Sequence, residues 1–123
     1  MMLRALLLLT VAGTSLAAAQ ERGAALFEPC RACHALDPAV TGTAGPNLAG
    51  LSGRRVGADP KFDYSPVLRA AAATGDVWSR ERLDTFLADP EAMFPSMWMT
   101  SRGIADPADR KALTDFLVDP KSR

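Results

Sequence analysis

The sequence has few of the side chains that build most metal and catalytic sites. Its 123 residues include 2 cysteines and 1 histidine, so a zinc site with four ligands would need carboxylates to complete it. Net charge is also absent, because 14 basic side chains balance 14 acidic ones, and this gives no support to nucleic acid as a partner. The apolar run near the N-terminus is shorter than the roughly 20 residues that a membrane-spanning helix needs. These absences argue against a zinc protein, a nucleic-acid-binding protein and stable insertion in a membrane.

The first nineteen residues have the pattern of a secretory leader. A short basic segment ending at Arg4 precedes an apolar segment over residues 5–12, and the alanines at 17–19 form a small-residue cleavage site. An uncleaved membrane anchor is the alternative, but the apolar segment is short for that role. We therefore predict a cleaved signal peptide over residues 1–19 and one small, soluble, periplasmic domain over residues 20–123.

A Cys-x-x-Cys-His motif stands at residues 30–34. It is typical of covalent haem c attachment, because two thiols must reach the two vinyl groups of a porphyrin while the adjoining imidazole meets the iron. The alternatives are half a zinc site and a thioredoxin-like dithiol, which needs a strand–helix–strand context that is missing nearby. Export favours haem, since neighbouring cysteines otherwise form a disulfide in an oxidising compartment. We predict one haem c attached at Cys30 and Cys33, with His34 as an iron ligand.

Apolar residues recur at helical spacing in short segments, and strand patterns are scarce. Ser65 and Ser79 are placed to cap two of these helices. Two long stretches, over residues 37–64 and 91–105, instead have the composition of loops, which is unusual in a small domain unless the loops wrap a ligand. We predict an all-α fold built around a central group. Its expected helices cover residues 21–28, 66–73, 80–88 and 107–118.

The iron would need a second axial ligand if its potential is high. Because His34 is the only histidine, the candidates are Met93, Met97 and Met99, or a vacant site. All three methionines lie in the second loop stretch, where a thioether can be brought over a porphyrin. Methionines are more often soft filler of the core, so the residues alone leave this choice open.

Further short motifs follow residues 30–34 in a specific order. They are Gly45 to Arg54, Phe62 to Ser65, Trp78, Leu87 to Pro90, Pro95 with Met99, Gly103-Ile104 and the last helix. In this order the chain resembles the class I c-type cytochromes, the group that includes mitochondrial cytochrome c and bacterial cytochromes c2. The resemblance implies the small class I cytochrome c fold, one covalent haem c and single-electron transfer.

The resemblance also implies roles for individual residues. The carbonyl of Pro46 would accept a hydrogen bond from His34, and Met99 would be the sixth iron ligand because it follows Pro95 at the spacing of the family. The first and last helices would cross where Gly23 and Phe27 meet Leu113 and Phe116. The residues expected to hold the haem propionates are Arg54, Tyr64 and Trp78.

Several positions depart from the family's usual residues. Met97 stands in place of a threonine that donates to a propionate, Phe86 in place of a tyrosine, and Ser101 in place of a phenylalanine at the haem edge. Lysines are also few, with Lys61, Lys111 and Lys121 alone. We therefore expect docking to depend less on long-range charge than on an apolar patch that includes Trp98 and Met97.

The leading interpretation is a soluble monohaem electron carrier that works between redox protein partners, a dehydrogenase or cytochrome complex as donor and an oxidase or reductase as acceptor. It is not expected to be an enzyme, because His34 and Met99 together would leave the iron no position for a substrate. One alternative is a haem subunit held within a larger periplasmic dehydrogenase. Another is a haem enzyme or sensor with an open sixth position.

Overall fold

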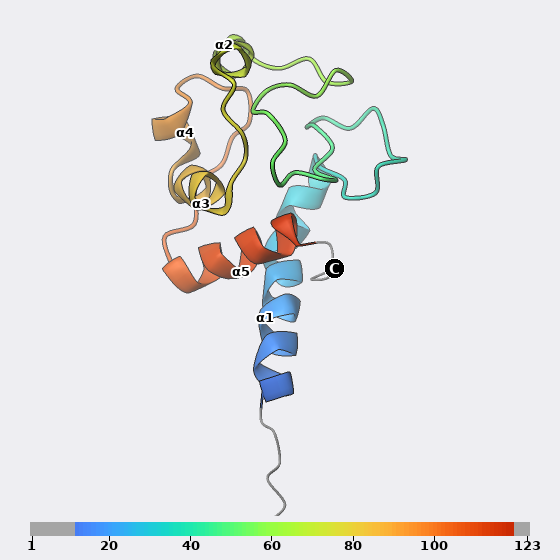
Figure 1. The fold of residues 1–123 in the computed structure, drawn as a ribbon, viewed down its shortest axis with the longest axis vertical. Coiled ribbons are helices and arrows are strands. Elements are labelled where there is room, and N and C mark those ends of the chain that lie inside the picture. The colour runs from blue at the N-terminus through green and yellow to red at the C-terminus, as the bar shows by residue number, and fades with distance from the viewer. Residues whose placement is uncertain (1–11, 120–123) are drawn as a thin grey trace, which may run out of the picture.

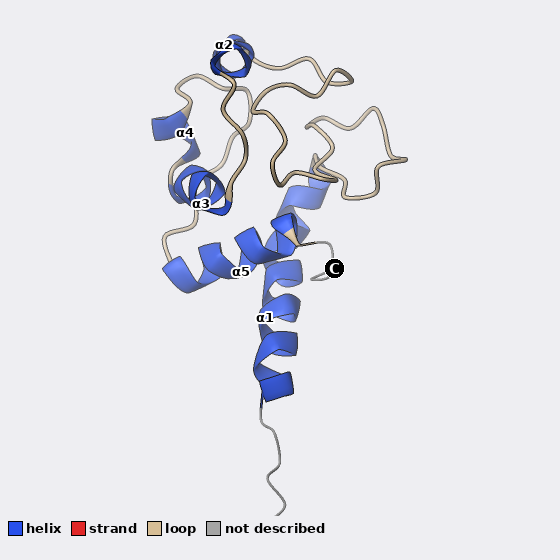
Figure 2. Ribbon diagram, in the orientation of Figure 1, coloured by secondary structure: helices blue, strands red, loops and turns tan. Residues whose placement is uncertain are grey.

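The structure, a computed structural model, describes residues 12–119, and helices joined by long loops make up this part of the chain (Figure 1). Between residues 12 and 119 it contains no strand, only one isolated antiparallel bridge between Arg55 and Val77 (Figure 2). The predicted all-α fold is therefore confirmed. Its elements are α1 (Ala12–Phe27), the 3-10 helix η1 (Glu28–Ala32), α2 (Pro66–Thr74), α3 (Arg80–Ala88), α4 (Pro90–Met93) and α5 (Pro107–Val118).

Helices α1 and α5 cross at a position where only glycine fits. A Cβ atom added at Gly23 would lie 2.6 Å from the carbonyl oxygen of Ala112 and 2.7 Å from Cβ of Phe116. One turn further along α1, the rings of Phe27 and Phe116 pack with centroids 5.7 Å apart. The predicted crossing is present, and the cost of a glycine inside a helix is offset by this close approach of two backbones.

The start of α1 differs from the prediction. We expected a short helix from Glu21, whereas α1 begins at Ala12 and runs through the predicted cleavage site. Four of the nine residues from 12 to 20 are alanine, the strongest helix former. The side chains of residues 15–19 are exposed, and this half of α1 extends away from the rest of the chain (Figure 1). The predicted leader's first eleven residues lie outside the described residues, as does Lys121.

Capping residues define most of the other helix ends. Ser79 caps α3 by accepting a hydrogen bond from the backbone N–H of Arg82, as predicted. Ser65 occupies the predicted N-cap position of α2, with Pro66 after it, but its side chain makes no capping hydrogen bond. The stop predicted at Asp89-Pro90 is confirmed, because α3 ends at Ala88, and Asp89 also caps the unpredicted turn α4 by accepting from the backbone N–H of Ala92.

The core lies where α1, α3 and α5 meet the loops. Three aromatic rings pack edge-on or tilted within it: Trp78 lies 5.2 Å from Phe86 and 6.4 Å from Phe94, centroid to centroid. These rings belong to the second half of the chain, whereas Leu51 and Val56 reach the core from the first long loop. The remaining buried members are Phe27, Leu83, Met97, Leu113, Phe116 and Leu117.

Candidate functional site

The Cys-x-x-Cys-His motif folds into one tight turn at the end of α1. Cys30 lies in η1, and its carbonyl oxygen accepts hydrogen bonds from the backbone N–H groups of Cys33 (3.1 Å) and His34 (2.9 Å). Both thiols are free, with Cys30 half-buried and Cys33 exposed. Burial raises the pKa of the Cys30 thiol above its usual value. The turn therefore presents two unbonded thiols and one imidazole from five consecutive residues.

The imidazole of His34 is oriented by a hydrogen bond to the backbone. Its Nδ1 lies 2.8 Å from the carbonyl oxygen of Pro46, the contact that the resemblance implied. A carbonyl oxygen can only accept, so Nδ1 carries the proton and donates it. The lone pair of Nε2 is therefore left free for a metal ion.

The segment beyond His34 closes tightly over the ring. A Cβ atom added at Gly45 would lie 2.5 Å from Cε1 and 2.8 Å from Nδ1 of His34, so this position holds only a glycine. Two backbone bonds of 2.8 Å fix the segment, from Gly45 N to the Cys33 carbonyl and from Leu48 N to the Ala35 carbonyl. The backbone at Gly45 and Pro46 therefore packs against one side of the His34 ring and fixes its orientation, as an axial ligand requires.

The three residues predicted to hold the propionates lie on two loops. Arg54 and Tyr64 belong to the first long loop, and Trp78 follows α2. Trp78 donates its backbone N–H to the Arg54 carbonyl (2.9 Å), while the Arg54 guanidinium donates to the Ala49 carbonyl (3.2 Å). Burial raises the pKa of the Tyr64 phenol, and the positive charge of Arg54 works in the opposite direction. The structure thus brings these three predicted residues near one another.

Sequence reasoning missed Ser65, which lies beside this cluster. Its side chain is 2% exposed, and its Oγ has no hydrogen-bond partner within the described chain. Burying an unpaired hydroxyl is costly, so an unmatched Oγ indicates a place for a polar ligand group. The signal was hidden because a serine before a proline is also the pattern of a helix cap.

The three methionines considered as sixth ligands occupy different environments. Met93 ends α4 and is partly buried. Met97 is 7% exposed and belongs to the core, whereas Met99 is partly buried and packs against the core's edge. The predicted apolar patch of Trp98 and Met97 was therefore wrong for Met97, because its side chain is buried in the core. Trp98 itself is 60% exposed.

We call residues 96–103, which carry Met99, the strap. At its start the backbone N–H of Ser96 donates to a side-chain oxygen of Glu91 (2.9 Å), and Ser96 has the left-handed φ of 64°. Just beyond its end, Ile104 N donates to the Leu87 carbonyl (2.8 Å). In the described chain, residues 98–102 make no backbone hydrogen bond to another element. The strap is therefore held by hydrogen bonds near its two ends and by the buried side chain of Met97.

The residues present fit a covalent haem by their chemistry. Two free thiols can form thioethers, an oriented imidazole and a methionine sulfur can ligate iron, and the orphaned hydroxyl of Ser65 can pair with a propionate. Among residues 12–119, no group of three or more histidine, cysteine or acidic side chains forms a metal site of its own.

Comparison with known proteins identifies the family of the chain. A family model described as "Cytochrome c" matches residues 20–120. A cytochrome c2 from Rhodopseudomonas palustris is 45% identical over 87 residues, which cover 71% of this chain and 73% of that protein. A cytochrome c2 from Agrobacterium tumefaciens is 35% identical over 97 residues, covering 79% of this chain and 87% of that protein.

Solved structures give the same result. The structure of cytochrome c2 from Rhodospirillum centenum superposes with a TM-score of 0.73 at 29% identity, covering 80% of this chain and 94% of that one. The chain belongs to the cytochrome c family, as a class I c-type cytochrome with the fold of that class. It is a monohaem electron-transfer cytochrome, and its cofactor is one covalently bound haem c.

Proposed function

We propose that Cys30 and Cys33 attach the haem and that His34 and Met99 are the axial ligands of its iron. The hydrogen bond from Nδ1 of His34 to the Pro46 carbonyl is the observation that carries the proposal, because it selects the tautomer whose Nε2 can bind iron. When bound, the haem supplies an iron that gains and loses one electron. The chain's own residues orient the imidazole, hold the thioether and keep water away.

The propionates of this haem would be held by Arg54, Tyr64 and Trp78, with Ser65 as a fourth partner. A buried carboxylate is costly unless it is paired or hydrogen-bonded. Arg54 supplies a half-buried positive charge, and the Ser65 Oγ supplies a buried donor without a protein partner. Replacing Ser65 with alanine tests its role, because the variant should have a shifted reduction potential if the hydroxyl donates to a propionate.

With His34 and Met99 both on iron, no coordination position is left for a substrate. The protein would then carry electrons and perform no reaction of its own. This separates it from a haem enzyme or sensor with an open sixth position. An open position would bind cyanide or imidazole without first displacing a protein ligand, so the rate of binding at increasing imidazole concentration distinguishes the two.

The chain would work in the periplasm after cleavage behind Ala19. Residues 15–19 are exposed, and the first buried residue of α1 is Gly23, so removing the leader would take little from the core. None of the described helices has both the length and the apolar character needed to cross a membrane. N-terminal sequencing of the exported protein should begin at Gln20, and a start near Met1 would contradict the cleavage.

We propose that the physiological partner is a redox protein with an uncharged, apolar docking face that receives Trp98. The indole is exposed on the strap, where Ser96, Thr100 and Ser101 carry no charge and Arg102 is the one charged side chain. Seven of the 14 cationic side chains are paired with acidic ones within the described chain, which reduces the positive charge left for long-range attraction.

The dependence of this docking on charge can be tested by varying the salt concentration. Electron-transfer rates with the partner should change less than about threefold between low and physiological ionic strength, since steering by charge is what salt screens. Trp98→Ala should lower the rate, whereas Trp98→Phe should retain most of it. A steep fall with salt would contradict the proposal. A chain that elutes only within a large complex would instead favour the dehydrogenase subunit.

Covalent attachment is tested by mass and colour. The purified, acid-denatured holoprotein should keep its haem on the polypeptide, with one haem mass added. Cys30→Ala and Cys33→Ala should each weaken this retention, because each removes one thioether bond. A denatured chain that loses its haem completely would overturn the attachment at these two cysteines.

A further inference from the structure

The end of the strap meets α3 at a position of close backbone approach. Gly103 has a φ of 78°, and a Cβ atom there would lie 2.2 Å from the Ala88 carbonyl oxygen. Immediately after it, Ile104 donates its N–H to Leu87, at the last turn of α3. The strap therefore ends against the C-terminal turn of α3.

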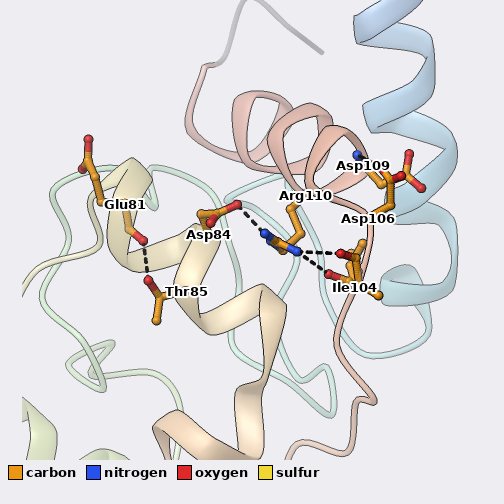
Figure 3. Close-up of polar contacts among 8 residues, drawn as sticks. Glu81, Asp84, Thr85, Ile104, Asp106, Asp109 and Arg110 are labelled. Atoms are coloured by element: carbon orange, nitrogen blue, oxygen red, sulfur yellow. Dashed lines mark hydrogen bonds and ion pairs between the residues drawn. The ribbon is translucent and has the colours of Figure 1, made fainter.

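Arg110, in the second turn of α5, lies across this same junction. Its guanidinium donates to the Ile104 carbonyl (2.9 Å) and the Ala105 carbonyl (3.0 Å), and its Nε donates to Asp84 of α3 (3.1 Å). Figure 3 shows the guanidinium between Asp84 and the backbone of Ile104. One side chain thus joins α3, α5 and the backbone that follows the strap.

Arg110 differs from the other cations that form ion pairs in the described chain. Its side chain is 16% exposed, whereas the others are 27% to 76% exposed. A planar guanidinium with several donors can bind a carboxylate and two carbonyls at once. Hydrogen bonds from a charged donor with little solvent around it are also stronger than exposed ones.

We infer that Arg110 is a positioning residue that holds the C-terminal end of the strap and so keeps Met99 on the iron. The inference rests on the proposed ligation by Met99. Within the described chain the strap has no backbone hydrogen bond between residues 98 and 102, and the buried Met97 lies before this span, so beyond Met97 its position depends on the downstream anchor and on the packing of Met99. Loss of the downstream anchor lets the strap open while the helices stay packed.

The fraction of protein with an opened strap can be measured by the binding of an external ligand, imidazole. Imidazole binds ferric haem only where Met99 has left, so its apparent affinity follows the fraction of open strap. Arg110→Ala in the ferric holoprotein should raise imidazole affinity about tenfold or more, the effect of losing charge-assisted hydrogen bonds. It should also weaken the absorption band at the red end of the visible spectrum that arises from methionine bound to ferric iron.

Arg80→Ala is the matched control. Arg80 also joins α3 to α5, through an ion pair with Asp115, but it makes no contact with the strap. We expect its imidazole affinity to stay within about twofold of wild type, since exposed ion pairs contribute little. Asp84→Asn, which leaves both carbonyl contacts of Arg110 in place, should also change affinity less than Arg110→Ala.

Should Arg110→Ala fail to fold, Arg110→Lys retains the charge and most of the stem but cannot span all three acceptors, and it should give a smaller rise in the same direction. Wild-type affinity in a folded Arg110 variant, or an equal rise in Arg80→Ala, would overturn the inference. If wild type already binds imidazole as tightly as Met99→Ala does, Met99 is not the ligand, and the proposed function and the inference both fail.

Discussion

The segment that carries His34 and the strap that carries Met99 are held in opposite ways. His34 lies within a dense set of short-range contacts: the Pro46 carbonyl binds its Nδ1, Gly45 closes over its ring, and Gly45 N binds the Cys33 carbonyl. The strap has hydrogen bonds near its ends and none between residues 98 and 102 and another element of the described chain. The histidine side is therefore held by several short-range contacts, whereas the methionine side has a span without backbone hydrogen bonds beyond the buried Met97.

We expect the largest loss of stability from Gly45→Ala, which disturbs the contacts that hold His34. Gly45→Ala would place a Cβ atom 2.5 Å from the His34 ring and so push the ring from its bond to Pro46. We expect the free energy of unfolding to fall by about 3 kcal/mol, as for overpacked cores. Chemical denaturation followed by fluorescence measures this.

Gly42→Ala is the control for that change. Gly42 lies in the same loop and has a φ of 75°, but nothing lies within 4 Å of an added Cβ atom. Its cost should be about 1 kcal/mol, the penalty for a left-handed backbone alone. Equal losses for both variants would show that the loop backbone, and not the His34 ring, limits stability.

The next effect tests whether Met97 serves the core and not the iron. Met97→Ala removes a side chain that is 7% exposed, and we expect a loss of about 2 to 3 kcal/mol. Met97→Leu nearly conserves volume and should cost less than about 1.5 kcal/mol. Thermal unfolding of the holoproteins measures both. A stable Met97→Ala variant would mean that the strap packs less tightly than the structure indicates.

A smaller loss of stability is expected when Asn47 is replaced. Its side chain makes three hydrogen bonds within the loop that follows His34. Its side-chain amide donates to the carbonyls of Asp37 (2.7 Å) and Val40 (3.0 Å), and its oxygen accepts from Ala49 N (2.8 Å). Asn47→Ala should cost about 1 to 2 kcal/mol by leaving these groups without partners. Asn47→Asp keeps the acceptor but sets a carboxylate oxygen against both carbonyls, so it should lose at least as much stability as Asn47→Ala in the same denaturation experiment.

The smallest expected effect is a gain in stability from replacing Ser96, at the start of the strap, with glycine. Ser96 has a φ of 64°, which glycine adopts without strain. Ser96→Gly should raise the free energy of unfolding by about 0.5 to 1 kcal/mol, and it leaves the N–H that donates to Glu91 in place. A destabilised variant would show that the flexibility of glycine in the unfolded chain outweighs the relief of strain.

The features predicted correctly from the sequence depend on short motifs and on the resemblance to a known family. The capping of α3 by Ser79 was predicted from a local motif and the contact between His34 and Pro46 from the resemblance to class I cytochromes, and the structure has both. The crossing at Gly23 was also predicted, because a glycine inside an amphipathic helix indicates close packing. Helix bounds set by turn residues were close to those observed, such as 66–73 for α2.

The missed features depend on tertiary context. No periodic pattern assigns the directions of side chains in an irregular strap, so the burial of Met97 was not predictable. The role of Arg110 was missed for a related reason, since two of its acceptors are backbone carbonyls, which have no sequence signature. The unpaired hydroxyl of Ser65 likewise becomes visible only once its surroundings are known.

The most direct test of the account is the visible spectrum of the ferric holoprotein in three forms. Wild type and Met97→Ala should both show the red-end band of methionine bound to iron, and Met99→Ala should lack it. That result would agree with a core role for Met97 and a ligand role for Met99 on the strap. A band that survives in Met99→Ala and disappears in Met97→Ala would contradict the account.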